Sequence, residues 1–134
     1  MKTIVFEVPG KPQGKARART FYNKRAGKTM SITPEGTVNY ENLIKVMFLQ
    51  SRPEQFKLIT TPVAVHIIAH YRKAKANKMP APMLKPDADN ICKCVLDALN
   101  GVAYQDDKQV IDVRIGKRWA EQDEKMTVSV QYSE

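Results

Sequence analysis

The residues best suited to chemistry are five carboxylates crowded into one stretch of a basic chain. They are Asp87, Asp89, Asp97, Asp106 and Asp107, whereas the whole chain carries a formal net charge of +8. Clustered acids repel one another unless a cation lies among them, and Mg²⁺ or Mn²⁺ prefers carboxylate oxygens together with retained waters. The stretch therefore predicts metal-assisted chemistry.

The first of these acids begin a predicted helix. Pro86 disfavours helical backbone at the residue before it, and either of the two aspartates that follow can cap the amino end. Asn100 followed by Gly101 is a typical stop, so we expect a helix over about residues 88–100. Its buried stripe is expected to consist of Ile91, Val95, Ala98 and Leu99.

The opposite face of this helix is polar and ordered by charge. Asp89, Lys93 and Asp97 follow one another at spacings of four residues, so they share one face and Asp97 is expected to pair with Lys93. Each feature also has an ordinary structural role: Asp87 as a helix cap, the lysine in a surface ion-pair ladder, the later acidic pair as a turn. None of these roles explains why the whole set falls within 21 residues.

The two acidic groups can meet if the chain folds back after the helix. The helix rises about 15 Å over ten residues, while the seven residues that end at Asp107 span up to about 23 Å when extended. We therefore expect Asp107 beside Asp87 and Asp89, in a site of three carboxylates that holds Mg²⁺ or Mn²⁺. Whether Asp106 shares this site stays open.

Two acid-free stretches supply the positive charge. Residues 10–28 hold seven basic side chains, and residues 69–85 hold five more. Lys15, Arg17 and Arg19 alternate, so an extended segment presents all three on one face toward a sugar-phosphate backbone. A duplex or branched DNA partner is predicted, against the plainer interpretation of solvated basic loops. The candidate DNA-binding residues are Lys11, Lys15, Arg17, Arg19, Arg72, Lys73 and Lys75.

The elements that position these residues indicate an α+β fold in a single domain over residues 1–134. The order β-α-β-α-β-β suggests a small mixed β-sheet with two main helices. Residues 10–28 are expected to form a long basic loop, and residues 121–124 a turn between the last two strands. The predicted strands cover 3–8, 62–71, 110–119 and 126–132, and the first helix covers about 34–51.

Other features limit the classes of protein and site. No stretch approaches the roughly 20 apolar residues that span a bilayer, so we expect no membrane contact and a cytoplasmic location. Cys92 and Cys94 diverge on the predicted helix and are expected to be free thiols. His66 and His70 lie on a strand pattern without nearby partners, so a zinc site is not expected.

The acidic stretch resembles the RusA family of Holliday junction resolvases, which occurs in bacteria and often on prophages. The similarity is densest over residues 85–115 and extends to the amino end, where Ala18 replaces a second proline common in that family's opening. The matching segments are Asp87-Ala-Asp89-Asn90-Ile-Cys-Lys93, Asp97-Ala-Leu, Asp106-Asp107-Lys-Gln109-Val110 and Pro9-Gly-Lys-Pro12-Gln-Gly-Lys15-Ala-Arg17-Ala-Arg19.

The resemblance implies a Mg²⁺-dependent, homodimeric endonuclease that makes paired cuts in four-way DNA junctions during recombination and repair. Carried over by position, Asp87, Asp89 and Asp107 are the metal-binding catalytic acids and Lys93 is the essential lysine. Two alternatives stay open. One is a non-catalytic basic DNA-binding protein; the other, ranked last, is a phosphatase with an Asp-x-Asp nucleophile, which needs a buried strand where this chain has Lys-Pro.

The basic amino-terminal stretch also contains two aromatic residues. Phe21 and Tyr22 lie together among its cations. Such side chains can wedge between bases at a DNA crossover, or they can anchor the loop by packing against the protein. An aromatic residue beside a basic loop is more often a packing anchor than a wedge.

Overall fold

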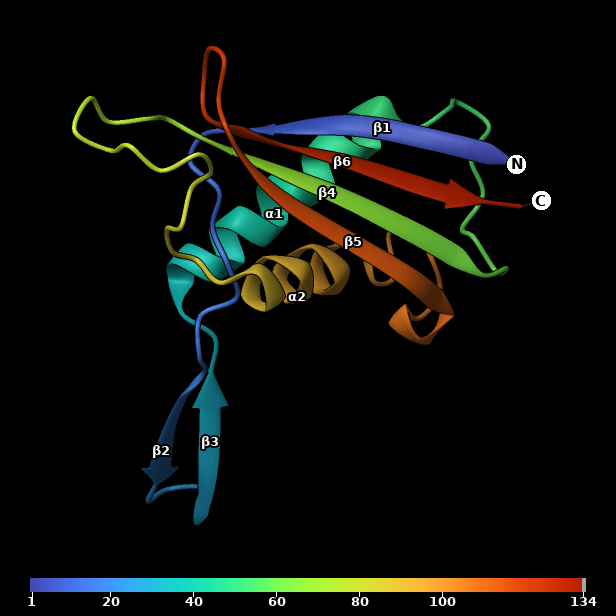
Figure 1. Cartoon of the computed structure of the whole chain (residues 1–134). Coiled ribbons are helices and arrows are strands. Elements are labelled where there is room, and N and C mark those ends of the chain that lie inside the picture. Colours follow the sequence, from blue (N-terminus) through green and yellow to red (C-terminus); the bar gives the residue numbers. More distant parts are fainter. Residues whose placement is uncertain (134) are drawn as a thin grey trace.

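Four strands form one mixed sheet, and two helices cover one of its faces (Figure 1). A computed structural model describes residues 1–133. The elements in chain order are β1 (Lys2–Pro9), β2 (Arg19–Asn23), β3 (Lys28–Ile32), α1 (Glu35–Ser51), β4 (Val63–Tyr71), α2 (Ala88–Leu99), the 3₁₀-helix η1 (Asp107–Gln109), β5 (Val110–Trp119) and β6 (Lys125–Tyr132). The predicted α+β class with a mixed sheet and two main helices is confirmed.

The strand order of the main sheet is β1-β6-β4-β5. β4 runs parallel to β5 and antiparallel to β6, which in turn pairs antiparallel with β1. The turn at residues 121–124 therefore does not join neighbouring strands, since β4 lies between β5 and β6. Alternate side chains of β4 are buried toward the helices, as its sequence alternation predicted: Val63, Val65, Ile67, Ala69 and Tyr71.

The helices bury the faces that their spacing indicated. α1 turns Tyr40, Ile44 and Phe48 into the core, and the Phe48 ring packs edge-on against Phe6 at 5.7 Å between ring centroids. It begins at Glu35 with Pro34 in the capping position, one residue later than expected. α2 buries its predicted apolar stripe and also Cys94, and both cysteines are free thiols.

The basic amino-terminal stretch is not one long loop, as we expected, because it contains a second sheet. Strands β2 and β3 pair antiparallel from Arg19 opposite Ile32 to Asn23 opposite Lys28. Threonine and aromatic residues favour strands, and Gly27 closes the turn with a positive φ of 64° that suits glycine. Figure 1 shows this hairpin standing away from the main sheet. Among residues 1–133, no helix is long and apolar enough to cross a membrane.

Candidate functional site

A groove of about 600 Å³ lies where three segments of the chain meet. The basic loop, residues 10–18, forms one wall, and the first turns of α1 and α2 form the others. Lys11, Lys85, Asp87 and Asn90 are among its lining residues. The groove therefore brings cations from both acid-free stretches next to the first predicted catalytic acid.

The basic loop is held close against α2. The backbone N–H of Lys15 donates to the carbonyl oxygen of Asn90 at 2.9 Å. Gly14 has no room for a side chain, since a Cβ built there would lie 2.9 Å from the Cβ atoms of both Asn90 and Pro86. Glycine at this position thus permits the loop to touch the segment that carries Asp87, a requirement that spacing alone did not reveal.

Replacing Gly14 with alanine is expected to push the loop away from α2. The crowded atoms are Cβ atoms close to the backbone, so relief requires backbone movement at a cost of about 1–3 kcal/mol. Chemical denaturation measures this loss. The matched control is Gly36→Ala in the first turn of α1, where a Cβ meets nothing within 4 Å and a gain of about 0.5–1 kcal/mol is expected. Equal effects of the two substitutions would contradict the close fit at Gly14.

Asp87 and Asp89 lie at the amino end of α2. Asp87 occupies the capping position, but its side chain accepts no capping hydrogen bond, and Asp89 lies in the first turn. Both side chains are exposed, as is Lys93 one turn further along the helix. Within residues 1–133 none of the three has an ion pair or a side-chain hydrogen bond. Two carboxylates and one amine are thus available to an external ligand.

Asp107 does not join them, and the expected return of the chain along α2 is wrong. The hydroxyl of Tyr104 donates to the carbonyl oxygen of Leu96 at 2.7 Å, and the N–H of Gly101 donates to the carbonyl oxygen of Tyr104. These bonds keep the segment at the carboxyl end of α2, where it leads into η1 and β5 (Figure 1). Over residues 1–133, no three acidic, histidine or cysteine side chains are grouped to hold a metal ion.

The neighbouring aspartates of η1 have different environments. Asp106 caps η1: its carboxylate accepts from the N–H of Lys108 at 3.0 Å, which lowers the pKa of Asp106, while Gln109 Oε1 accepts from the N–H of Asp106. A hydrogen bond with the Asp106 carboxylate raises the pKa of Asp107. The structure thus gives the Asp106 carboxylate a capping role in η1.

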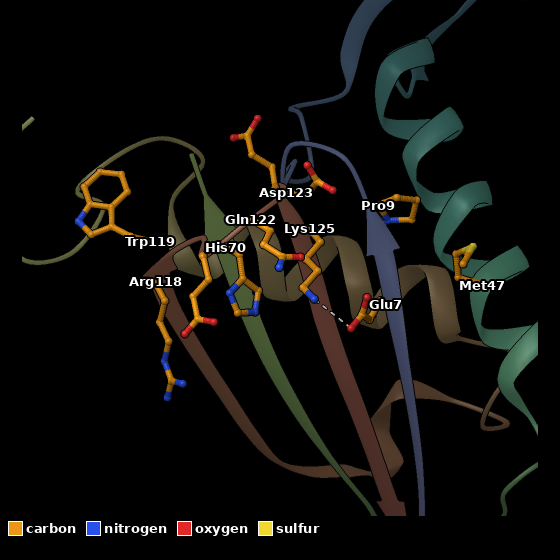
Figure 2. Close-up of a pocket in the computed structure, with 11 residues that line it drawn as sticks. Glu7, Pro9, Met47, His70, Arg118, Trp119, Gln122, Asp123 and Lys125 are labelled. Atoms are coloured by element: carbon orange, nitrogen blue, oxygen red, sulfur yellow. Dashed lines mark hydrogen bonds and ion pairs between the residues drawn. The ribbon is translucent and has the colours of Figure 1, made fainter. Parts of the chain in front are cut away.

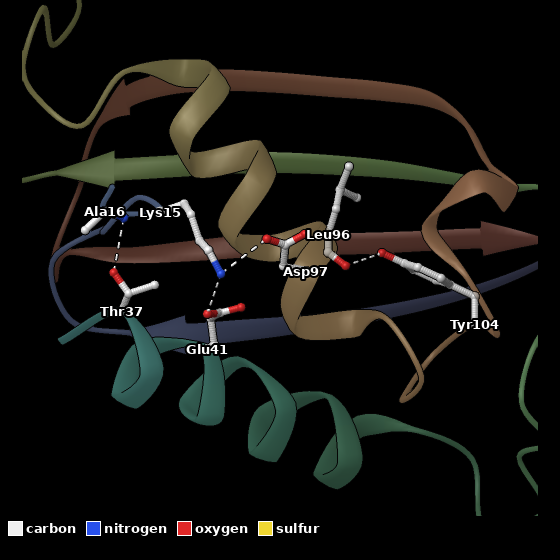
Figure 3. A network of polar contacts seen from close by, with 7 residues as sticks. All are labelled: Lys15, Ala16, Thr37, Glu41, Leu96, Asp97 and Tyr104. Carbon is white, nitrogen blue, oxygen red and sulfur yellow. Dashed lines mark hydrogen bonds and ion pairs between the residues drawn. The ribbon is translucent and has the colours of Figure 1, made fainter. Parts of the chain in front are cut away.

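Lys15 points between the two helices rather than out to solvent (Figure 3). Its ammonium lies 3.0 Å from Glu41 Oε1 and 3.3 Å from Asp97 Oδ2. Asp97 therefore pairs with Lys15. The predicted pairing of Asp97 with Lys93 is wrong. Since two carboxylates already neutralise it, we assign Lys15 to holding the basic loop against α1 and α2 instead of to binding phosphates. The N–H of Ala16, which donates to Thr37 Oγ1, adds to this attachment.

Replacing Lys15 with methionine is expected to destabilise the fold by about 1–2 kcal/mol, between the values for exposed and buried pairs. Burial opposes the charge of Lys15, but its hydrogen bonds to Glu41 and Asp97 and their charges outweigh this and raise its pKa above 10.5. A group whose pKa is raised by folding contributes its full stabilisation at pH values below its ordinary pKa, and that contribution is lost as the pH rises through the raised pKa. The difference between wild type and variant should therefore stay constant near neutral pH and shrink as the pH rises past about 10.5.

Urea denaturation at several pH values checks this expectation. The matched control is Lys125→Met, which breaks the Lys125–Glu7 pair at 3.1 Å, where the two side chains are 37% and 59% exposed. That exposed pair should contribute no more than about 1 kcal/mol. A loss for Lys15→Met no larger than the control's would refute the role assigned to Lys15.

The other predicted DNA-binding residues remain at the surface. Arg17 and Arg19 are exposed, as are Arg72, Lys73 and Lys75 at the start of the second acid-free stretch. Lys73 lies over the Trp119 ring, 6.0 Å from its centroid. The Trp119 indole N–H donates to the carbonyl oxygen of Met79, and Lys117 Nζ donates to that of Leu84. The carboxyl end of β5 thus holds the loop that follows Lys75.

A second hollow of about 630 Å³ lies at the β5–β6 connection (Figure 2). It is lined by His70, Arg118, Lys125 and Glu7, together with the turn at residues 121–124. Burial lowers the pKa of His70, and the nearby charges of Lys125 and Arg118 lower it further, while Glu7 is paired with Lys125. None of the predicted catalytic residues lines this hollow, so we take the groove at Asp87 as the candidate site although it is slightly smaller.

Comparison with known proteins decides the family. The sequence profile described as endodeoxyribonuclease RusA matches residues 9–131, nearly the whole chain. This chain belongs to the RusA endodeoxyribonuclease family. It is also 33% identical to a Bacillus subtilis (strain 168) protein named "Uncharacterized protein YqaN", over 134 aligned positions that cover 91% of this chain and 92% of that protein.

Membership of the RusA family makes the chain a nuclease of the Holliday junction resolvase type. The matched region spans the basic loop, the hairpin, α2 and η1, so the groove and its acids lie within it. Sequence reasoning identified Asp87, Asp89 and Lys93, which the structure leaves available on α2. It missed Gly14 and Glu41, since neither residue carries a local pattern that points to its partner.

Proposed function

We propose that this chain is a Mg²⁺-dependent, structure-selective endodeoxyribonuclease that resolves four-way DNA junctions by paired cuts, in recombination and repair. Mn²⁺ can replace Mg²⁺ at such a site, because both ions accept carboxylate and water oxygens. The observation that carries the proposal is the pair of carboxylates at the amino end of α2, Asp87 and Asp89. Neither has a side-chain partner within residues 1–133, and Asp87 lines a groove together with cations. If these aspartates served only to cap α2 or to pair with lysines, their carboxylates would be occupied by those contacts and not available to a cation.

The donor set fits a hard divalent cation. Mg²⁺ commonly takes one or two protein carboxylates, keeps several waters and accepts substrate phosphate oxygens. Asp87 and Asp89 supply two such carboxylates, one at the cap of α2 and one in its first turn. Asp107 stays in the proposed set on the family resemblance, although it lies at the other end of α2. When bound, the cation supplies Lewis acidity and an activated water.

The chain's own residues bind and orient the phosphate. Lys11 and Lys85 line the groove next to Asp87 and would hold the strand that is cut. Lys93 lies one turn from Asp89 and would stabilise the negative charge that develops on the scissile phosphate or on the leaving oxygen. Arg17, Arg19, Arg72, Lys73 and Lys75 would contact phosphates further along the DNA arms.

A homodimer is part of the proposal. A four-way junction offers two equivalent strands for cutting, and a two-fold symmetric protein presents two identical sites to them. The expected mass in solution is therefore twice the chain's 15.2 kDa.

The experiment is incubation of the protein with a labelled four-way junction and, as the control, a linear duplex of matched sequence. Each is tested with Mg²⁺, Mn²⁺, Ca²⁺ or a chelator. We expect nicks in the junction with Mg²⁺ or Mn²⁺, none with the chelator and few in the duplex. Equal cutting of both substrates would contradict structure selectivity. Tight binding without cutting under every metal favours the alternative of a non-catalytic DNA-binding protein.

A further inference from the structure

The hairpin of β2 and β3, which we call the arm, is a separate two-stranded sheet that projects from the groove side of the molecule (Figure 1). It leaves the body directly after the basic loop and returns directly before α1, the two segments that wall the groove. A two-stranded sheet alone is only marginally stable in water. The arm therefore stands to gain order from a partner that also reaches the groove.

The charge of the arm identifies the class of partner. It carries Arg19, Lys24, Arg25 and Lys28 and no acid. Within the described residues 1–133, none of these four cations forms an ion pair. Unpaired cations on a projecting element favour a polyanion.

Hydrogen bonds hold the backbone of the turn at the tip of the arm. Asn23 Oδ1 accepts from the backbone N–H groups of Arg25 and Ala26, at 2.9 and 3.1 Å, and the N–H of Gly27 donates to the carbonyl oxygen of Asn23 at 2.8 Å. The side chains of Lys24 and Arg25 take no part in these bonds. Two cations are thus presented from a hydrogen-bonded turn, so the backbone of the tip needs little further ordering when they bind.

The two faces of the arm differ in chemistry. Strand alternation and register place four hydroxyl side chains on one face, with Thr20 opposite Ser31 and Tyr22 opposite Thr29. Tyr22 is 62% exposed and Phe21, on the other face, 41%. The aromatic side chains are therefore not buried anchors. Hydroxyls both donate and accept, so this face can meet the edges of any base pair.

We propose that the arm lies in the major groove of one duplex arm of the junction, with its hydroxyl face toward the base edges and its tip cations on the phosphates. The proposal rests on the proposed function. The major groove, about 12 Å wide, admits a two-stranded ribbon without deformation, whereas the minor groove, about 6 Å wide, must be widened to admit one, at a cost in DNA deformation energy. The arm then guides the duplex toward the groove that holds Asp87.

The test compares two double variants that each remove two cations. The tip variant is Lys24→Ala with Arg25→Ala; the control is Arg52→Ala with Lys57→Ala, two exposed cations outside the arm and the groove. We expect the tip variant, but not the control, to weaken duplex and junction binding and to reduce the slope of log affinity against log salt by about 2. Cutting at saturating DNA should stay within about threefold of wild type.

Methylation protection then reads the groove directly, because guanine N7 lies in the major groove and adenine N3 in the minor groove. We expect wild type, but not the tip variant, to protect guanine N7 over about half a helical turn. Protection confined to adenine N3, or a tip variant with unchanged affinity, salt slope and footprint, would overturn the proposal while leaving cutting intact. Guanine protection without any cutting would refute the proposed function and support the arm. Failure to bind DNA would overturn both.

Discussion

Replacing Asp89 with asparagine, or Asp87 with asparagine, is expected to reduce junction cutting by at least about 10³-fold. Each substitution keeps the shape of the side chain and removes a carboxylate that can bind the cation. Loss of several kcal/mol of transition-state stabilisation corresponds to this factor. Single-turnover cleavage of a labelled junction measures the effect.

Neither asparagine variant is expected to harm the fold, since both carboxylates are exposed and make no bonds within residues 1–133. Junction affinity should stay equal or rise, because a negative charge has been removed from a surface that meets phosphates. Asp123→Asn, in the exposed turn between β5 and β6, is the matched control and should cut normally. Full activity of Asp89→Asn would exclude Asp89 from the cation site.

Replacing Lys93 with methionine is expected to lower the cutting rate at saturating DNA by about 10²- to 10³-fold. A positioned charge that stabilises the transition state contributes on this scale. Because Lys93 is exposed and unpaired among the described residues, the loss should appear in the rate and not in the melting temperature.

The matched control for Lys93 is Lys57→Met, which removes another exposed charge from a residue that does not line the groove. Lys93→Arg should recover part of the rate, since it restores the charge with a different geometry. If Lys93→Met changed only the affinity for DNA, and by no more than Lys57→Met does, Lys93 would be one phosphate contact among many.

Most of the fold follows from local patterns in the sequence. β4 and α2 each bury one face, so the alternation in Val63–Tyr71 and the four-residue spacing from Ile91 were sufficient to predict them. The hairpin was missed because its two strands bury little and their residues lie among cations, so the segment had the composition of a solvated loop.

The contacts that position the site depend on residues far apart in the chain. The span of about 23 Å for the seven residues after α2 assumed a fully extended chain. The segment instead stays at the carboxyl end of α2, where the Tyr104 hydroxyl donates to the carbonyl oxygen of Leu96. Lys15 binds Glu41, which lies 26 residues further along the chain, and no spacing rule connects residues so far apart. Sequence therefore predicted which charged side chains α2 presents, but not that Asp97 pairs with Lys15 instead of Lys93, nor which loop is held against the helix.

The most direct test of the proposed function uses a supercoiled plasmid that extrudes a cruciform, which is a four-way junction. Paired cuts across the junction give linear plasmid, whereas a single cut gives a nicked circle. With Mg²⁺ we expect linear product from wild type and none from Asp89→Asn, and no cutting of a plasmid that lacks the inverted repeat. If wild type retarded the cruciform plasmid but left it uncut in every divalent metal, the chain would not be a junction nuclease.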